Sequence, residues 1–374
     1  MGGAWESICR DFRRLRVLVL RHLGTEEVSP LIEKLKHLKY LDLSKNDMKA
    51  LPSSVTNLVN LQVLKLNDCR YLKELPRDIN KLINLRHLDN DSCGRLEYMP
   101  RGIGKLTSLQ TLSCFVVAKN RSPKSKMAGG LDELSGLNEL RGSLEIRVEG
   151  YEKDSCISEF EGAKLKDKQY LQCLTITWRD IDMDSDIDLY EKILQSLQPN
   201  SSLQELRVRG YGGMRFPSLL SDLSNLVRIH LACCTRLEHI PPLDGIPSLE
   251  ELWIENMENL EYIDSEGVGG KEVSKLESLF ESKSQGMIPY LPSLQQLRIR
   301  DCSEEPSRGW GNESEEVWPN IKHIPNIIIN NRYIQKEGRI LTYRKVSVTA
   351  SSLIPNILIN RSYIQKEGRY VEGI

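Results

Sequence analysis

The 374-residue chain lacks the features of a membrane protein and of a small secreted disulfide protein. No apolar run approaches the roughly 20 residues that a membrane-spanning helix needs. The apolar stretch at 17–20 is too short for the core of a signal peptide and is surrounded by basic residues. Nine cysteines in so long a chain do not make the dense framework of small secreted domains. The sequence therefore predicts a cytoplasmic protein with free thiols and no membrane insertion.

The chain also lacks an excess of charge of either sign. Its 51 lysines and arginines balance 52 aspartates and glutamates, so no global field would attract nucleic acid or an anionic membrane. Its six histidines are scattered without the spacing of a metal site. No serine or cysteine stands in a recognisable nucleophile motif. We therefore expect no enzyme activity, no cofactor, no metal and no nucleic-acid partner.

Leucine at a regular period is what the sequence has in abundance. The phrases LRVLVL, LKYLDL, LQVLKL, LRHLDN and LQTLSC begin 23, 23, 24 and 24 residues apart, at Leu15, Leu38, Leu61, Leu85 and Leu109. A period of roughly 20 to 29 residues with the pattern L-x-x-L-x-L-x-x-[N/C] is typical of a leucine-rich repeat. This period predicts the architecture and favours binding over chemistry.

The physical meaning of the phrase is a stack of short strands. Alternation within L-x-L sends two leucines to one face of each strand, and stacked repeats bury these faces in a continuous core. Leu-Pro or Met-Pro pairs follow, and proline ends the strand. The prediction is an α/β leucine-rich-repeat solenoid, a horseshoe with parallel β-strands on the concave face and turns and short helices on the convex face. Four apolar residues are expected in the convex-side core: Ile32, Val55, Ile79 and Ile103.

The ninth position of the repeat is occupied by asparagine or cysteine in five repeats. These residues are Asn46, Cys69, Cys93, Cys234 and Cys302. Because the repeat pattern itself expects these residue types, four of the nine cysteines receive a structural role without redox chemistry.

The second half of the chain repeats the phrase at irregular intervals. Six further strands are predicted around Leu144, Leu171, Leu203, Leu226, Leu249 and Leu294, with insertions at 118–135, 148–168, 179–200 and 264–288. Four segments follow from this spacing. They are a short N-terminal segment without a full cap (1–14), regular repeats (15–117), irregular repeats with insertions (118–330), and a C-terminal tail (331–374). The tail contains a duplication, because IPNIIIN and YIQKEGR (324–339) recur at 354–369 as IPNILIN and YIQKEGR.

The outward positions of the strands offer a candidate protein-binding surface. Tryptophan and arginine are the residue types that most often anchor protein interfaces, and both gather in the later repeats. The register predicts that both Trp178 and Trp253 project outward with arginines around them. The candidate partner-binding residues are Trp178, Arg207, Arg228, His230, Trp253 and Arg298.

Two short motifs resemble ligand sites, but each departs from the pattern that its ligand requires. The segment GIGKLT (102–107) lacks the serine or threonine directly after lysine, and the earlier glycine, that a phosphate loop requires. The segment DIDMDSDIDLYE (180–191) has oxygen ligands at the spacing of a calcium loop, but Ser185 stands where a glycine is required. Calcium binding and a solvated acidic loop leading into a short helix both stay open, and the preceding strand favours the loop.

Six stretches of the chain resemble the repeat domain of plant coiled-coil, nucleotide-binding, leucine-rich-repeat disease-resistance proteins. They are LPSSVTNLVNLQVLKLNDCRYLKELPRDINKLINLRHLD, MPRGIGKLTSLQTL, LNELRGSLEI, AKLKDKQYLQCLTITW, LQSLQPNSSLQELRVRGYGGMRFPSLLSDLSNLVRI and LEHIPPLDGIPSLEELWI. The resemblance covers about residues 12 to 330. The phrases LRGSL, LKDK and GYGG followed by RFP carry most of its specificity.

The resemblance implies a protein-recognition module in plant defence. In that family the repeat domain senses pathogen effectors or altered host proteins, and it folds back on the nucleotide-binding module to regulate it. The expected partners are therefore an effector, a host protein or that module. No phosphate loop precedes the repeats here, so we expect a truncated receptor or a partial gene product that does not bind nucleotide. The alternative is a free-standing intracellular scaffold for signalling proteins, because the phrase LP-x-x-I-x-x-L-x-x-L is shared with such scaffolds.

Overall fold

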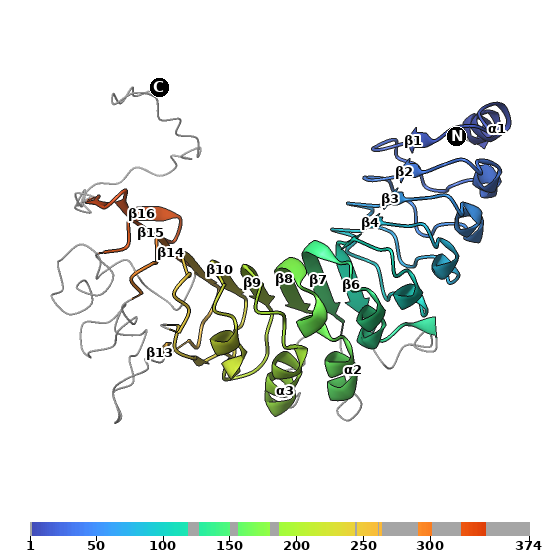
Figure 1. Cartoon of the computed structure of the whole chain (residues 1–374). Helices are drawn as coiled ribbons and strands as arrows, with labels where there is room; N and C mark the ends of the chain where they lie inside the picture. The colour runs from blue at the N-terminus through green and yellow to red at the C-terminus, as the bar shows by residue number, and fades with distance from the viewer. Residues whose placement is uncertain are drawn as a thin grey trace, which may run out of the picture. The chain divides into compact units, whose positions relative to one another are not determined.

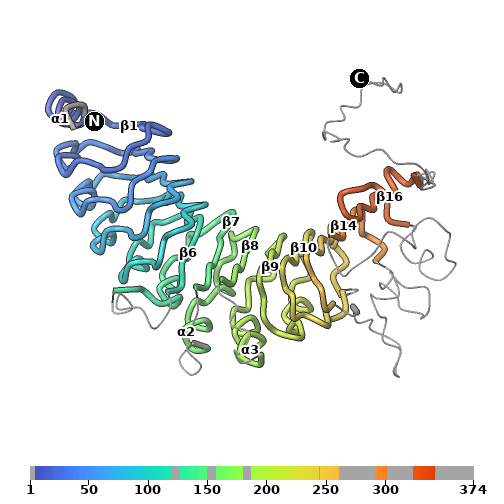
Figure 2. Tube along the Cα trace, turned by 180° about the vertical axis from the view of Figure 1, so that it is seen from behind, coloured from blue at the N-terminus to red at the C-terminus, as the bar shows by residue number. Residues whose placement is uncertain are grey.

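The computed structural model divides the chain into two compact units, residues 1–341 and 342–374. It describes residues 2–118, 127–149, 156–179, 187–243, 245–260, 262–263, 291–300 and 323–341. The second unit, which contains the duplicated copy at 354–369, lies outside the described residues. All that follows concerns the first unit (Figures 1 and 2).

The regular repeats build a parallel five-stranded sheet in the order of the chain. Its strands are β1 (Val17–Val19), β2 (Tyr40–Asp42), β3 (Val63–Lys65), β4 (His87–Asp89) and β5 (Thr111–Leu112). The middle leucines of the five phrases are paired across the sheet in one row, as Leu18, Leu41, Leu64, Leu88 and Leu112. All five are buried, so the predicted register is confirmed.

A second sheet of ten strands follows the first along the described chain, and its first seven strands run parallel. They are β6 (Cys114–Val117), β7 (Arg141–Val148), β8 (Tyr170–Trp178), β9 (Glu205–Arg209), β10 (Arg228–Ala232), β12 (Glu251–Glu255) and β14 (Gln296–Arg300). Three more strands complete the sheet: β15 (Asn326–Ile329), which is parallel to β14, and the antiparallel β16 (Arg332–Lys336) and β17 (Arg339–Ile340). A separate pair consists of β11 (His239–Ile240) and β13 (Tyr262–Ile263).

Short helices lie on the other side of the strand stack (Figure 1). The α-helices are α1 (Gly2–Asp11), α2 (Cys156–Gly162) and α3 (Ile187–Leu197). The 3₁₀ helices are η1 (Pro30–Lys34), η2 (Ser53–Asn57), η3 (Ile79–Lys81), η4 (Ile103–Lys105), η6 (Leu131–Gly136), η7 (Leu165–Asp167) and η8 (Ser218–Asp222). Each of η1 to η4 buries the apolar residue predicted for the convex-side core. The chain is thus an α/β leucine-rich-repeat solenoid.

The ninth-position residues bond to the backbone of the preceding repeat. The Asn46 amide nitrogen donates to the carbonyl of Leu20 in the preceding repeat and to that of Leu43 in its own repeat, 2.7 and 2.8 Å away. In the next repeats a thiol does the same, since Cys93 Sγ lies 3.1 Å from the Leu66 carbonyl oxygen. Burial raises the pKa of the Cys93 thiol to about 12, which keeps it protonated and able to donate. The predicted structural role of these cysteines has a physical basis, although Cys302 lies outside the described residues.

Both ends of the first unit contain structure that the sequence analysis did not predict. The segment expected to lack a full cap forms helix α1, which buries Trp5 and Cys9 in the common core. Residues 331–341, which we assigned to the tail, form the hairpin β16–β17 against β15. Positive φ angles at Asn330 and Asn331 make the tight turn before β16. The sheet therefore extends about ten residues beyond the predicted start of the tail.

Candidate functional site

Four of the predicted partner-binding residues form one continuous row across neighbouring strands. Arg207 of β9 is paired with His230 of β10, His230 with Trp253 of β12, and Trp253 with Arg298 of β14. Arg228 stands two positions before His230 and so points to the same side. We call these five side chains the β9–β14 face.

Trp253 lies at the centre of the face between two nitrogen-bearing side chains. The Arg298 guanidinium carbon is 4.9 Å from the centroid of the indole, and the His230 ring meets the indole edge-on with centroids 5.4 Å apart. Both contacts are of the attractive kind for an indole ring. The three side chains are half-buried, so their rotamers are restrained before any partner arrives.

This cluster leaves buried donor groups without hydrogen bonds. Trp253 Nε1 and Arg298 Nε are shielded from solvent and have no hydrogen-bond partner among the described residues. A buried donor without a partner costs about 1–3 kcal/mol.

A single carboxylate organises the arginines beside the cluster. Glu205 Oε1 accepts from Arg207 Nε at 2.5 Å, and Glu205 Oε2 accepts from Arg228 Nε at 3.2 Å. The Glu205 side chain is 10% exposed, while those of Arg207 and Arg228 are 50% and 44% exposed. Both carboxylate oxygens of Glu205 are engaged by these contacts. The outer ends of the two guanidinium groups stay open to solvent.

His230 is held in its neutral form at physiological pH. Burial lowers its pKa from the ordinary 6.5, and it outweighs the opposing effect of Glu255, whose Oε2 lies 3.6 Å from His230 Nε2. The positive charge of the face therefore resides on its arginines.

The sixth predicted residue, Trp178, was wrongly placed on this face. Its side chain is 5% exposed and packs against Tyr190 of α3 and Tyr211, with ring centroids 6.4 and 5.5 Å away. The reason is strand alternation, because Trp178 has the same parity as the buried Leu174 and Ile176. Trp178 anchors α3 to the sheet and is not available to a partner.

The described residues of the two ligand-like motifs form contacts within the chain. The amide nitrogens of Gly102 and Gly104 donate to Glu133 Oε1 and Oε2 at 2.6 and 2.8 Å, so a carboxylate already occupies the place of a phosphate. In the acidic segment, residues 180–186 lie outside the described residues. The predicted helix that follows is present as α3, and Glu191 accepts from the Arg215 amide at 3.0 Å. Within the described part of the chain, no group of three or more potential ligands could hold a metal ion.

Comparison with known proteins decides the family. The model of the leucine-rich repeat region family matches residues 5–306. The chain belongs to this leucine-rich repeat family. Helices long and apolar enough to span a bilayer are not found among its described residues.

Its curated relatives are named as disease resistance proteins of plants. A putative disease resistance protein of Arabidopsis thaliana is 38% identical over 317 residues, which is 77% of this chain and 21% of that protein. Putative disease resistance protein RGA1 of Solanum bulbocastanum is 33% identical over 302 residues, or 77% of this chain and 30% of that protein. This leucine-rich repeat chain thus spans less than a third of the length of either relative. Among solved structures, an internalin of Listeria monocytogenes gives a TM-score of 0.48 at 18% identity, covering 86% of this chain and 82% of that one.

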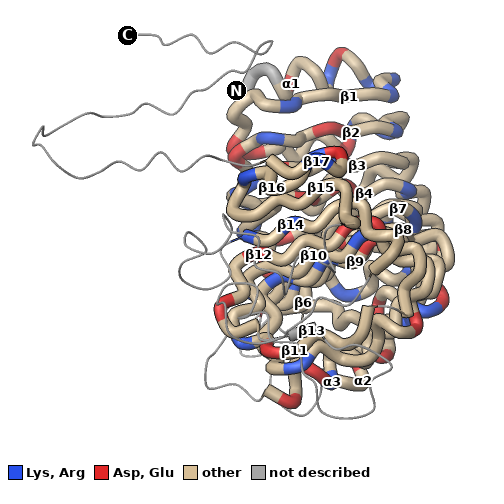
Figure 3. Tube along the Cα trace, turned by 90° about the vertical axis from the view of Figure 1, so that its left-hand side faces the viewer, with Lys and Arg blue, Asp and Glu red and all other residues tan. Residues whose placement is uncertain are grey.

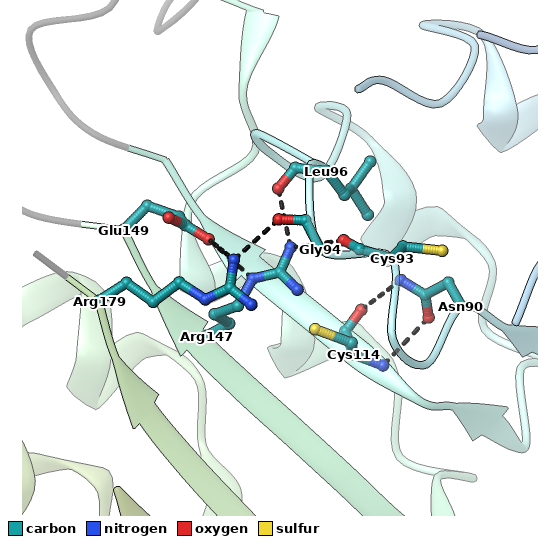
Figure 4. A network of polar contacts seen from close by, with 8 residues as sticks. All are labelled: Asn90, Cys93, Gly94, Leu96, Cys114, Arg147, Glu149 and Arg179. Atoms are coloured by element: carbon teal, nitrogen blue, oxygen red, sulfur yellow. Dashed lines mark hydrogen bonds and ion pairs between the residues drawn. The ribbon is translucent and has the colours of Figure 1, made fainter. Parts of the chain in front are cut away.

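One polar cluster of this leucine-rich repeat chain was missed from sequence (Figure 4). Arg147 of β7 is 2% exposed and donates from Nη2 to the carbonyls of Cys93 and Leu96 at 3.1 and 2.8 Å. Arg179 Nη1 donates to the Gly94 carbonyl at 2.8 Å. Glu149 Oε1 lies 2.8 Å from Arg147 Nε and 3.7 Å from Arg179 Nη1.

These contacts join the second sheet to the first. The carbonyls belong to the turn that follows β4. Arg147 lies in β7, and Arg179 directly follows β8. Backbone carbonyls leave no side-chain signature, and Arg147 is more than 50 residues from its acceptors. No repeat pattern could have revealed the pairing.

Proposed function

We propose that this chain is a protein-recognition module in plant defence and that the β9–β14 face binds the partner. The stack of Arg298, Trp253 and His230 carries the proposal, because a restrained tryptophan packed against an arginine is the composition of an interface anchor. The names of the curated relatives support the biological setting. Recognition by this surface would be binding and not catalysis.

The finer role that we propose follows the same relatives. The partner would be a pathogen effector, a host protein altered by one, or the nucleotide-binding module of an immune receptor. The setting would be the cytoplasm. A parallel sheet that offers one open row of side chains across many strands suits a folded or extended protein segment better than a small molecule.

The experiment compares two matched double variants. Tagged wild-type protein, Trp253→Ala/Arg298→Ala and Tyr71→Ala/Arg95→Ala are expressed in leaf tissue, and bound proteins are quantified by mass spectrometry. The control pair is also an arginine over an aromatic ring, 5.0 Å from its centroid, but it is not on a strand. Loss of an anchor costs about 2 kcal/mol or more, roughly thirtyfold in affinity.

The proposal predicts that some bound proteins are no longer recovered with Trp253→Ala/Arg298→Ala but are still recovered with Tyr71→Ala/Arg95→Ala. Circular dichroism melts of both variants establish that each is folded at the assay temperature. Equal recovery of every bound protein with all three chains would contradict the proposal.

The alternative, a free-standing intracellular scaffold, rests on the LP-x-x-I-x-x-L-x-x-L phrase of the regular repeats. Under it the lost proteins would be signalling enzymes such as small GTPases and phosphatases. Identification of the lost proteins therefore separates the two functions.

A further inference from the structure

Lysines and arginines occur along the whole of the described solenoid (Figure 3), and on one group of neighbouring strands they outnumber the acidic residues. The strands β9, β10, β12 and β14 carry five arginines and three glutamates, an excess of two positive charges. By contrast, β2, β3 and β4 carry two aspartates and one lysine. The near-zero net charge of the whole chain conceals this local difference.

The arginines of the face are fixed in position before a partner arrives. Arg207 and Arg228 are each held by Nε on the same Glu205 carboxylate, which leaves their terminal nitrogens as two adjacent, open forks. Arg298 is held against the Trp253 ring. A planar guanidinium fork matches a carboxylate with two parallel hydrogen bonds, and fixed forks lose little entropy on binding.

Two of the three glutamates among them are already engaged. Glu205 is bound by two arginines, and Glu255 faces His230 at 3.6 Å. A partner thus meets open guanidinium groups, a Glu205 carboxylate that is already bound by two arginines, and a net excess of positive charge on these strands. An acidic surface is complementary to this arrangement, and a basic one is not.

We infer that the occupant of the β9–β14 face is an acidic segment of a partner protein, with aspartate or glutamate carboxylates on the Arg207 and Arg228 forks. This inference rests on the proposed function and specifies the chemistry of the partner. A neighbouring carboxylate of the same segment would meet Arg298.

The test uses labelled probes of defined charge on the full chain. Fluorescence anisotropy is measured with an eight-residue glutamate peptide, a neutral glycine-serine peptide, an eight-residue lysine peptide and an eight-nucleotide thymidylate. The variant is Arg207→Gln/Arg228→Gln. The control is Arg70→Gln/Arg77→Gln, which removes the same charge from exposed positions outside the strands.

We expect wild type and control to bind the glutamate peptide at least tenfold more tightly than the neutral and lysine peptides. The affinity of the variant for the glutamate peptide should fall by roughly tenfold or more, because hydrogen bonds between charged groups are stronger than those between neutral groups. Added salt should weaken the binding. Three results would overturn the inference: equal binding of glutamate and neutral peptides, equal loss in the control, or equal binding of the thymidylate, which would show that charge alone is sensed.

Failure here is distinguishable from failure of the proposed function. If acidic peptides do not bind but the Trp253→Ala/Arg298→Ala variant still loses protein partners, the face binds proteins of another chemistry. If neither effect is seen, the face is not a binding surface.

Discussion

Removal of the Arg147 side chain should weaken the junction between the two sheets. The Arg147→Ala variant loses two hydrogen bonds from a charged group to the carbonyls of Cys93 and Leu96, and it separates the ion pair with Glu149. Both carbonyls lose a donor in a buried environment, and Glu149 retains only the more distant Arg179.

The magnitude follows from burial. Breaking a buried ion pair by removing one partner costs about 3–5 kcal/mol. Glu149 is 22% exposed, so water compensates part of its loss and the lower end of this range, about 3 kcal/mol, applies. Arg179 is 42% exposed, its ion pair contributes at most about 1 kcal/mol, and its hydrogen bond to the Gly94 carbonyl is exposed to solvent. Arg179→Ala is therefore the matched control.

Urea denaturation followed by circular dichroism measures the difference. Because each repeat contacts only its neighbours, a weakened junction should also divide the single unfolding transition into two. We expect a large loss for Arg147→Ala and a small loss for Arg179→Ala. Equal losses for the two variants, or a change below about 0.5 kcal/mol for Arg147→Ala, would refute the reasoning, because such values are ordinary for surface substitutions.

Three further outcomes are expected. Gly212→Ala should lower the free energy of unfolding by about 1–3 kcal/mol in urea melts, because the added Cβ would lie 2.7 Å from the Tyr190 ring; an unchanged melt would contradict this. His230 should titrate below pH 6.5 in NMR spectra. Since its folded pKa is lowered, its contribution to stability is present above pH 6.5 and is lost as the pH falls through that value and below; titration above 6.5 would contradict the packing. The Cys93 thiol, with a pKa of about 12, should not react with Ellman's reagent at pH 8 until the chain unfolds; rapid labelling of the native protein would show that it is accessible.

The repeat pattern predicted the fold because one local rule recurs. The same leucine spacing determines which residues pair across the sheet, so one period predicts the row of five buried leucines. The positions of His230, Trp253 and Arg298 on one row also followed from this rule. The prediction for Trp178 was wrong because this residue alternates in step with the buried Leu174 and Ile176 of its own strand.

The features that the sequence did not reveal depend on contacts outside the repeat rule. Arg147 binds backbone carbonyls, which every residue possesses, so its partners are determined only by the folded path of the chain. The β16–β17 hairpin had a signal that we did not use, because the residue pairs Asn330-Asn331 and Glu337-Gly338 are both suited to tight turns and both have positive φ angles. The contact of Glu205 with both Arg207 and Arg228 requires β9 and β10 to be in register, and the sequence of neither strand alone predicts that contact.

The central claim is that the β9–β14 face binds the partner, and site-specific photocrosslinking tests it most directly. A photoreactive phenylalanine analogue is placed at one of two positions. The first is Thr175 of β8, which is paired with Arg207 and so borders the β9–β14 face, and the second is the exposed Asp222 of η8. In plant cells, we predict that irradiation joins the Thr175 variant to a protein partner and leaves the Asp222 variant free. Crosslinking from Asp222 and not from Thr175 would contradict the account.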